Sequence, residues 1–311
     1  MGPSLWFDDL PVVGALLPQE AAAKLREVGE HEIADQLDMV QDYSSQVFNM
    51  GDRVRRWPFQ DRPWMHTAHA FGYLASPTEN TDDPLPIRSV GNLPADPTLK
   101  HTRINLTLNR LRVASYPGGG THRILLHFFA QNQMLDVTED VHFNTTYRVQ
   151  EGEHAGLQGY PIFIGLNVGG EGMSFRCRTI NVSNDEDEAF LSFLESDIFK
   201  AGLKLASTAQ PVIAPFSVLA FGLTKSIATR HRNVAVQDFD LGLDFSTIPM
   251  GARLAEGSYL AVQIPENQKV IWNWNDWVYH PNIAQVVKRS EPHQFIPYNY
   301  LIFSITRYKG P

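Results

Sequence analysis

Apolar and polar residues alternate in successive short runs from residue 104 to the end of the chain. In the first run Ile104, Leu106 and Leu108 fall on one parity, after which Leu111 takes up the opposite one. A period of two is that of a β-strand, whose side chains point to opposite faces in turn. The change of parity predicts a β-bulge near Asn109. This part of the chain must therefore fold mainly as β-structure.

Further runs of this kind predict strands over residues 124–130, 141–149, 161–168, 173–182, 234–245, 258–264, 269–274 and 298–306. The last run is apolar on both faces, which is typical of a strand at the centre of a covered sheet. Seven to nine strands with short turns predict a mainly β fold: an antiparallel two-layer β-sandwich, jelly-roll-like in one form, or a barrel.

Two segments have helical character instead. Residues 18–40 carry apolar side chains at spacings of three to five, which predicts an amphipathic helix that is interrupted near Gly29. An acidic helix start at 184–188 precedes a stretch, 205–224, without any charged residue. Because this stretch contains two prolines, it is a poor membrane span, and a buried helical insertion over 185–230 is the favoured interpretation. Insertion of 205–224 into lipid is the alternative.

The chain has 311 residues, and we expect two parts. Residues 1–100 would form the helical arm and an irregular connector rich in proline and aromatic residues, and residues 101–311 the β-sandwich with its insertion. The net charge of -8 makes a nucleic-acid partner unlikely and disfavours, without excluding, a membrane partner. Cys177 is the single cysteine, and alternation in the predicted strand 173–182 puts it on the same side as Met173 and Phe175, which predicts a buried thiol. A single cysteine and the lack of a signal-peptide pattern favour a cytoplasmic location.

The densest aromatic cluster lies near the C-terminus and is interleaved with polar residues. Its members are Trp272, Trp274, Asp276, Trp277 and Tyr279. Flat aromatic faces next to hydrogen-bonding side chains would suit a carbohydrate or another small ligand. The alternative is a loop that plugs one end of the sandwich, since large aromatic side chains bury the most area.

Three carboxylates, Asp238, Asp240 and Asp244, fall on one face of the predicted strand 234–245. Here the chain resembles the C2-type calcium- and lipid-binding β-sandwich family, in the strand pair 104–113 and 124–130 and in this aspartate run. The resemblance implies a C2-like sandwich in which the three aspartates help to bind Ca²⁺, which then bridges to lipid. The residues themselves also fit a solvated acidic face.

No spacing links the remaining candidates into a catalytic site. His66 and His69 stand three apart and could share a helical turn as metal ligands, but core or surface histidines are the favoured interpretation. Gly118, Gly119 and Gly120 lead into a strand and predict a turn, and Arg232 follows the helical insertion. The sequence therefore favours a non-enzymatic protein-interaction or structural module that binds a protein partner or associates with itself as an oligomer. Carbohydrate or small-ligand binding and a membrane-active effector are the alternatives.

Overall fold

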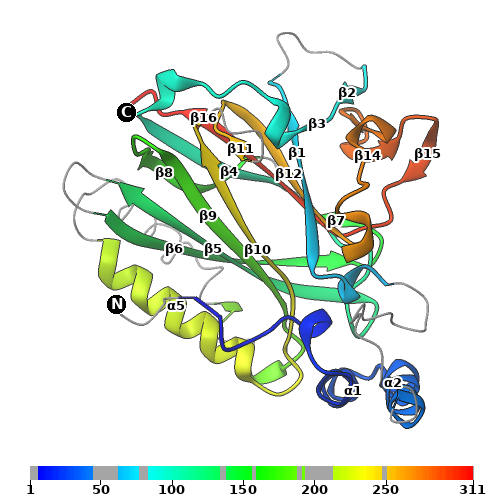
Figure 1. The fold of residues 1–311 in the computed structure, drawn as a ribbon. Helices are drawn as coiled ribbons and strands as arrows, with labels where there is room; N and C mark the ends of the chain where they lie inside the picture. The colour runs from blue at the N-terminus through cyan, green and yellow to red at the C-terminus, as the bar shows by residue number, and fades with distance from the viewer. Residues whose placement is uncertain are drawn as a thin grey trace.

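The computed structural model describes residues 6–44, 62–76, 83–133, 138–155, 159–187, 191–192, 213–246 and 251–310. The fold is mainly β, as predicted. Its described strands pair antiparallel, except for one parallel pair between β10 (Val234–Asp244) and β11 (Ala252–Arg253). Figure 1 shows two large sheets whose strands run at an angle to each other, with the helices on the outside.

The first sheet has the order β3-β1-β12-β16-β4-β7, with β8 also paired to β4. Its strands are β1 (Ala68–Leu74), β3 (Arg88–Ser89), β4 (Arg103–Arg112), β7 (His154–Ala155), β8 (Tyr160–Asn167), β12 (Gly257–Ile264) and β16 (Tyr300–Arg307). The predicted bulge is confirmed, because the β4–β16 register skips Asn109 between Leu108 and Arg110. The central position of β16, between β12 and β4, is confirmed as well.

The second sheet has the order β11-β10-β9-β5-β6. Its strands are β5 (Thr121–Gln133), β6 (Thr138–Gln150), β9 (Gly172–Asn181), β10 (Val234–Asp244) and β11 (Ala252–Arg253). The two large sheets share one core: Phe175 of β9 meets Phe303 of β16 edge to face, with ring centroids 5.0 Å apart. Cys177 lies fully buried in this core, as predicted.

A third, smaller sheet of order β15-β14-β13-β2 stands at one end of the fold. It is built from β2 (Leu85–Pro86), β13 (Trp277–His280), β14 (Gln285–Lys288) and β15 (Glu291–Phe295). Short 3-10 helices join the strands: η1 (Val13–Ala15), η2 (Pro63–Met65), η3 (Val90–Asn92), η4 (Pro97–Leu99), η5 (Asp185–Asp187), η6 (Glu266–Gln268) and η7 (Trp274–Asp276).

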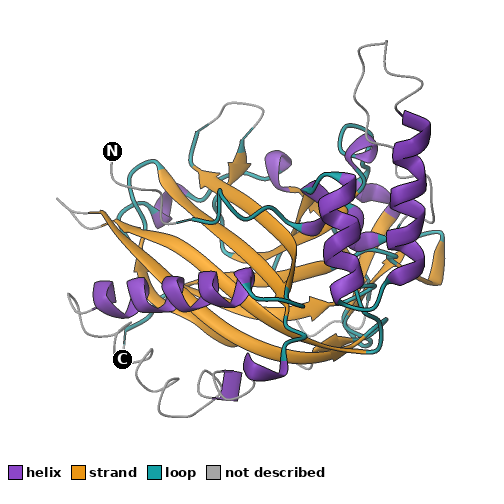
Figure 2. Cartoon of the chain, turned by 90° about the horizontal axis from the view of Figure 1, so that it is seen from below, coloured by secondary structure: helices purple, strands orange, loops and turns teal. Residues whose placement is uncertain are grey.

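The N-terminal helix breaks where the sequence indicated. α1 (Pro18–Glu27) and α2 (His31–Ser44) flank Gly29, whose φ of 86° is costly for any residue with a side chain. Figure 2 shows the two helices side by side against one end of the sheets. Their apolar sides, including Leu25 and Leu37, belong to the main core. The rest of the same chain therefore covers the apolar face of this helical pair.

The helical insertion ends in α5 (Ile213–Thr229), which lies across β5 and β6 on the outer face of the second sheet (Figure 1). Phe221, Thr224 and Ile227 are buried against that face, so this part of the insertion is a covering helix, as predicted. Residues 193–212, with the first part of the uncharged stretch, lie outside the described residues. Among the described helices, none is long and apolar enough to cross a bilayer.

Two predictions of local structure were wrong. Residues 269–274 are not a strand but a turn that leads into η7, and Val270 and Ile271 point into solvent. Conversely, Ala68–Leu74 forms a full strand, β1, inside the proposed irregular connector. Because β1 pairs along its length with β12, residues before position 100 contribute directly to the first sheet.

Candidate functional site

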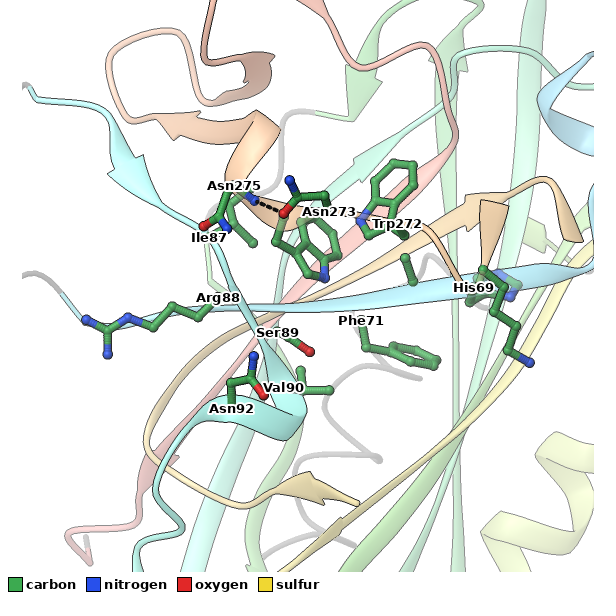
Figure 3. Close-up of a pocket in the computed structure, with 13 residues that line it drawn as sticks. His69, Phe71, Ile87, Arg88, Ser89, Val90, Asn92, Trp272, Asn273 and Asn275 are labelled. Atoms are coloured by element: carbon green, nitrogen blue, oxygen red, sulfur yellow. Dashed lines mark hydrogen bonds between the residues drawn. The ribbon is translucent and has the colours of Figure 1, made fainter. Parts of the chain in front are cut away.

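A cleft of about 490 Å³ opens where β1 and β3 meet the segment that precedes β13. β1 contributes His69 and Phe71 to its wall, and the chain from β3 into η3 contributes Arg88, Ser89 and Asn92. The opposite wall consists of Lys269, Trp272, Asn273, Trp274 and Asn275. Figure 3 shows this second wall facing Ser89 and Asn92, with His69 at one end of the cleft and Arg88 at the other.

The tryptophans are held in place from behind. Trp272 meets Trp274 edge to face at 5.5 Å, and its other neighbour, Trp277, stacks parallel to it at 6.0 Å. Trp274 rests on β1, where a side chain at Gly72 would come within 2.9 Å of the Trp274 ring. The absence of a side chain at position 72 is therefore what lets Trp274 lie against the strand.

Hydrogen bonds fix the backbone of the same wall. Asn273 accepts a bond at its Oδ1 atom from the Asn275 backbone N–H (3.1 Å) and donates from Nδ2 to Asp276 (3.3 Å). Arg289 donates from Nε to the Asn275 backbone carbonyl (2.7 Å), and its backbone N–H donates to the Asp276 backbone carbonyl (2.7 Å). The wall is thus rigid before any ligand arrives, which lowers the entropy cost of binding.

His69 forms the buried end of the cleft. Burial lowers its pKa to about 4, and the positive charge of Lys269 acts in the same direction, so the ring is neutral at pH 7. The Thr67 backbone and Gln237 oppose this shift slightly, but Nε2 of His69 makes no hydrogen bond of ordinary geometry with any described residue. The ring itself packs against Phe239 at 5.0 Å.

The cleft is positive at its edges. Arg88 and Lys269 are exposed, and neither forms an ion pair within the described part of the chain. Among the residues that line the cleft there is no aspartate or glutamate. Aromatic faces, amide groups and two cations therefore surround one concave space.

Of the predicted ligand residues, only Trp272 and Trp274 line the cleft. Asp276, Trp277 and Tyr279 lie behind it, where they support η7 and the small sheet. The sequence pattern marked His69 only as a candidate metal ligand and did not indicate the other lining residues, because nothing in the sequence joins residues 69–92 to residues 269–275. These residues are Phe71, Arg88, Ser89, Asn92 and Lys269. Two strand pairings bring these distant segments together, that of β1 with β12 and that of β2 with β13.

The aspartate run lies elsewhere, on β10 at the outer face of the second sheet. Asp240 pairs with Arg176 at 2.9 Å and Asp244 with Arg253 at 2.9 Å. Asp238 lies 3.5 Å from Arg178, and burial raises its pKa to about 6. Each carboxylate that was expected to meet Ca²⁺ thus faces a guanidinium. No group of three or more His, Cys, Asp or Glu side chains converges among the described residues.

The two histidines are not on a helical turn. His69 lies in β1, and His66 follows η2. Both are buried, which agrees with their interpretation as core histidines.

Comparison of the chain with protein-family models, with curated proteins and with solved structures found no match.

Proposed function

We propose that the protein is a binding module for a carbohydrate, which it holds in the cleft between Phe71 and the tryptophan pair. The observation that carries the proposal is the cleft itself, in which two segments far apart in sequence place aromatic rings and amide side chains around one concave space. Ligand sites in proteins are typically concave, largely apolar and equipped with a few well-placed polar groups.

The chemistry of a sugar ring matches this lining. Its apolar C–H face can lie on Trp272 or Phe71, while its hydroxyls can reach the side chains of Ser89, Asn92 and Asn275. Tryptophan supplies a large, stiff contact surface with a single N–H, so little conformational entropy is lost on binding. The finer fold assignment, a C2-like or jelly-roll sandwich, is part of the same proposal and rests on the two antiparallel sheets around one core.

Isothermal titration calorimetry of the whole protein against a panel of neutral, amino and acidic oligosaccharides tests the proposal. We expect one class to bind and Trp272→Ala to weaken it by about 2 kcal/mol, or roughly 30-fold, as at other aromatic hot spots. Asn92→Ala, a change at an exposed position, tests the same cleft without touching the core. Phe295→Ala removes an exposed aromatic ring outside the cleft and is the matched control.

A second candidate is the protein-interaction module, which one observation favours. Val270 is 93% exposed and Ile271 75% exposed, directly beside the cleft. A protein partner or a second copy of the chain would remove these side chains from water. Light scattering of the native chain and of Val270→Ser over a range of concentrations tests binding to a second copy, which predicts a mass that rises with concentration and depends on Val270.

A further inference from the structure

A second cavity, of about 390 Å³, is lined by none of the residues of the tryptophan cleft. It lies where the start of β5 and the end of β6 meet the chain that follows α5. Arg123 of β5, Arg148 of β6 and Arg232 beyond α5 all line it. Thr121 and Ser183 add hydroxyl groups, and no aspartate or glutamate is among its described lining residues. On a chain with a net charge of -8, a concave site lined by three arginines is an unusual concentration of positive charge.

The strand register forces two of these charges together. Arg123 and Arg148 are direct cross-strand partners in the antiparallel β5–β6 pair, so their side chains leave the same face of the sheet. Like charges placed directly opposite each other destabilise a sheet, and an anion between them removes that repulsion. Each of the two also interacts with another group of the chain, so it is their charge and placement at the cavity that matter.

Carboxylates do occur at the rim, but two of them are already matched by other cations. Glu27 pairs with Lys24 at 2.8 Å and also accepts the Arg232 backbone N–H at 3.0 Å. Glu30 accepts the Gly118 backbone N–H at 3.0 Å and lies 3.7 Å from Arg62. Of the described carboxylates near the cavity, Glu151 remains, and its negative charge acts on the His122 ring.

His122 closes the buried side of the cavity. Its side chain is 2% exposed, and its Nε2 atom has no hydrogen-bond partner among the described residues. A buried polar atom without a partner is costly in a folded protein and often marks a functional position. Because burial lowers the pKa of His122, the ring is neutral at pH 7 and can accept or donate one hydrogen bond.

From this arrangement we infer a binding site for a ligand with at least two phosphate charges, separate from the tryptophan cleft. Guanidinium groups bind phosphate oxygens in pairs, and hydroxyl groups complete the coordination. Gly118 and Gly119, both with positive φ (98° and 57°), leave that side of the cavity free of side chains, so the ligand can approach the backbone closely. The glycine run, which the sequence analysis interpreted as a simple turn, thus forms one wall of the site.

Calorimetry with inorganic pyrophosphate and with ATP, on the full chain without magnesium, tests the soluble source of such a ligand. Sedimentation with phosphatidylcholine vesicles, with and without phosphatidylinositol bisphosphate, tests a lipid headgroup as the source. Arg148 and Arg232 are exposed, so the double variant R148Q/R232Q keeps the core intact. We expect it to bind at least about tenfold more weakly than the native chain in whichever arm binds, since charged hydrogen bonds are lost.

Lys309→Gln is the control, and we expect it to bind with native affinity. It removes an exposed charge next to Tyr308, whose backbone N–H donates to Arg103 at the start of β4. Trp272→Ala should also leave phosphate binding unchanged, which makes this result independent of the carbohydrate proposal. Absence of binding in both arms, or equal affinity of the native chain and R148Q/R232Q, overturns the inference.

Discussion

A pair of histidines lies buried beneath α5 and makes the protein sensitive to acid. Nε2 of His127 on β5 and Nδ1 of His142 on β6 are 2.9 Å apart, and the other ring nitrogen of His127 meets Asn144 and Thr224. If Nδ1 of the neutral His127 ring donates to the side-chain Oδ1 atom of Asn144, its Nε2 must accept a hydrogen bond from Nδ1–H of His142. The bond between the two rings needs at least one neutral ring, because two imidazolium rings would both donate and would repel each other.

The magnitude follows from the pKa of His142, which burial lowers to about 4. In the unfolded chain the same ring takes up a proton near pH 6.5, so the native state loses stability as the pH falls from that value toward 4. Between pH 7 and pH 4.5 the loss is about 2.5 kcal/mol for His142 alone. Burial also holds the pKa of His127 well below its ordinary value, and the loss from that ring has the same sign.

Urea denaturation of the native chain and of His142→Gln at pH 7 and at pH 4.5 measures this effect. The change in unfolding free energy between the two pH values should be smaller in the variant by about 2.5 kcal/mol. Comparison of variants is needed because Asp238, with its pKa raised to about 6, contributes with the opposite sign in this range. His293→Gln, at an exposed position on β15, replaces a histidine outside this cluster and is the control variant. An equal pH dependence in His142→Gln would refute the reasoning.

Three further predictions concern packing and reactivity. Gly72→Ala should cost about 1–3 kcal/mol in thermal unfolding and abolish binding in the tryptophan cleft, whereas Gly242→Ala, with open space around it, should do neither. Arg178→Met should destabilise the fold by about 3–5 kcal/mol in urea, because it removes the buried guanidinium that faces the partly buried Asp238 carboxylate and donates to the Phe7 and Leu10 carbonyls, and adding Asp238→Asn should recover part of that loss. Cys177 should not react with a thiol reagent in the native state, because burial raises its pKa and closes access; rapid labelling without denaturant would contradict its placement.

Features that depend on neighbouring residues could be predicted from the sequence. Gly29 ends α1 because a positive φ is cheap only for glycine, and the bulge at Asn109 follows from a change in alternation. Cys177 was placed in the core because it shares its parity with Phe175 in one strand. In each case a local rule and the tertiary structure demand the same conformation.

Where tertiary contacts decide, the sequence misled. The run that contains Val270 and Ile271 has strand-like composition, yet it pairs with nothing and is exposed. The strand Ala68–Leu74 was overlooked because it contains small residues and stands among prolines, and its pairing with β12 is what makes it a strand. The tryptophan cleft and the arginine cavity both join residues far apart along the chain, and the periodicity of a sequence does not predict which distant segments come into contact.

The indole N–H signals of the protein in solution test the proposed carbohydrate site most directly. The chain has six tryptophans, which single Trp→Phe variants would assign. On titration with a binding oligosaccharide, the signals of Trp272 and Trp274 should shift together, while that of Trp64, which is fully buried elsewhere in the core, stays in place. Movement of other indole signals while those of Trp272 and Trp274 remain fixed, or no shift with any sugar of the panel, would contradict the account.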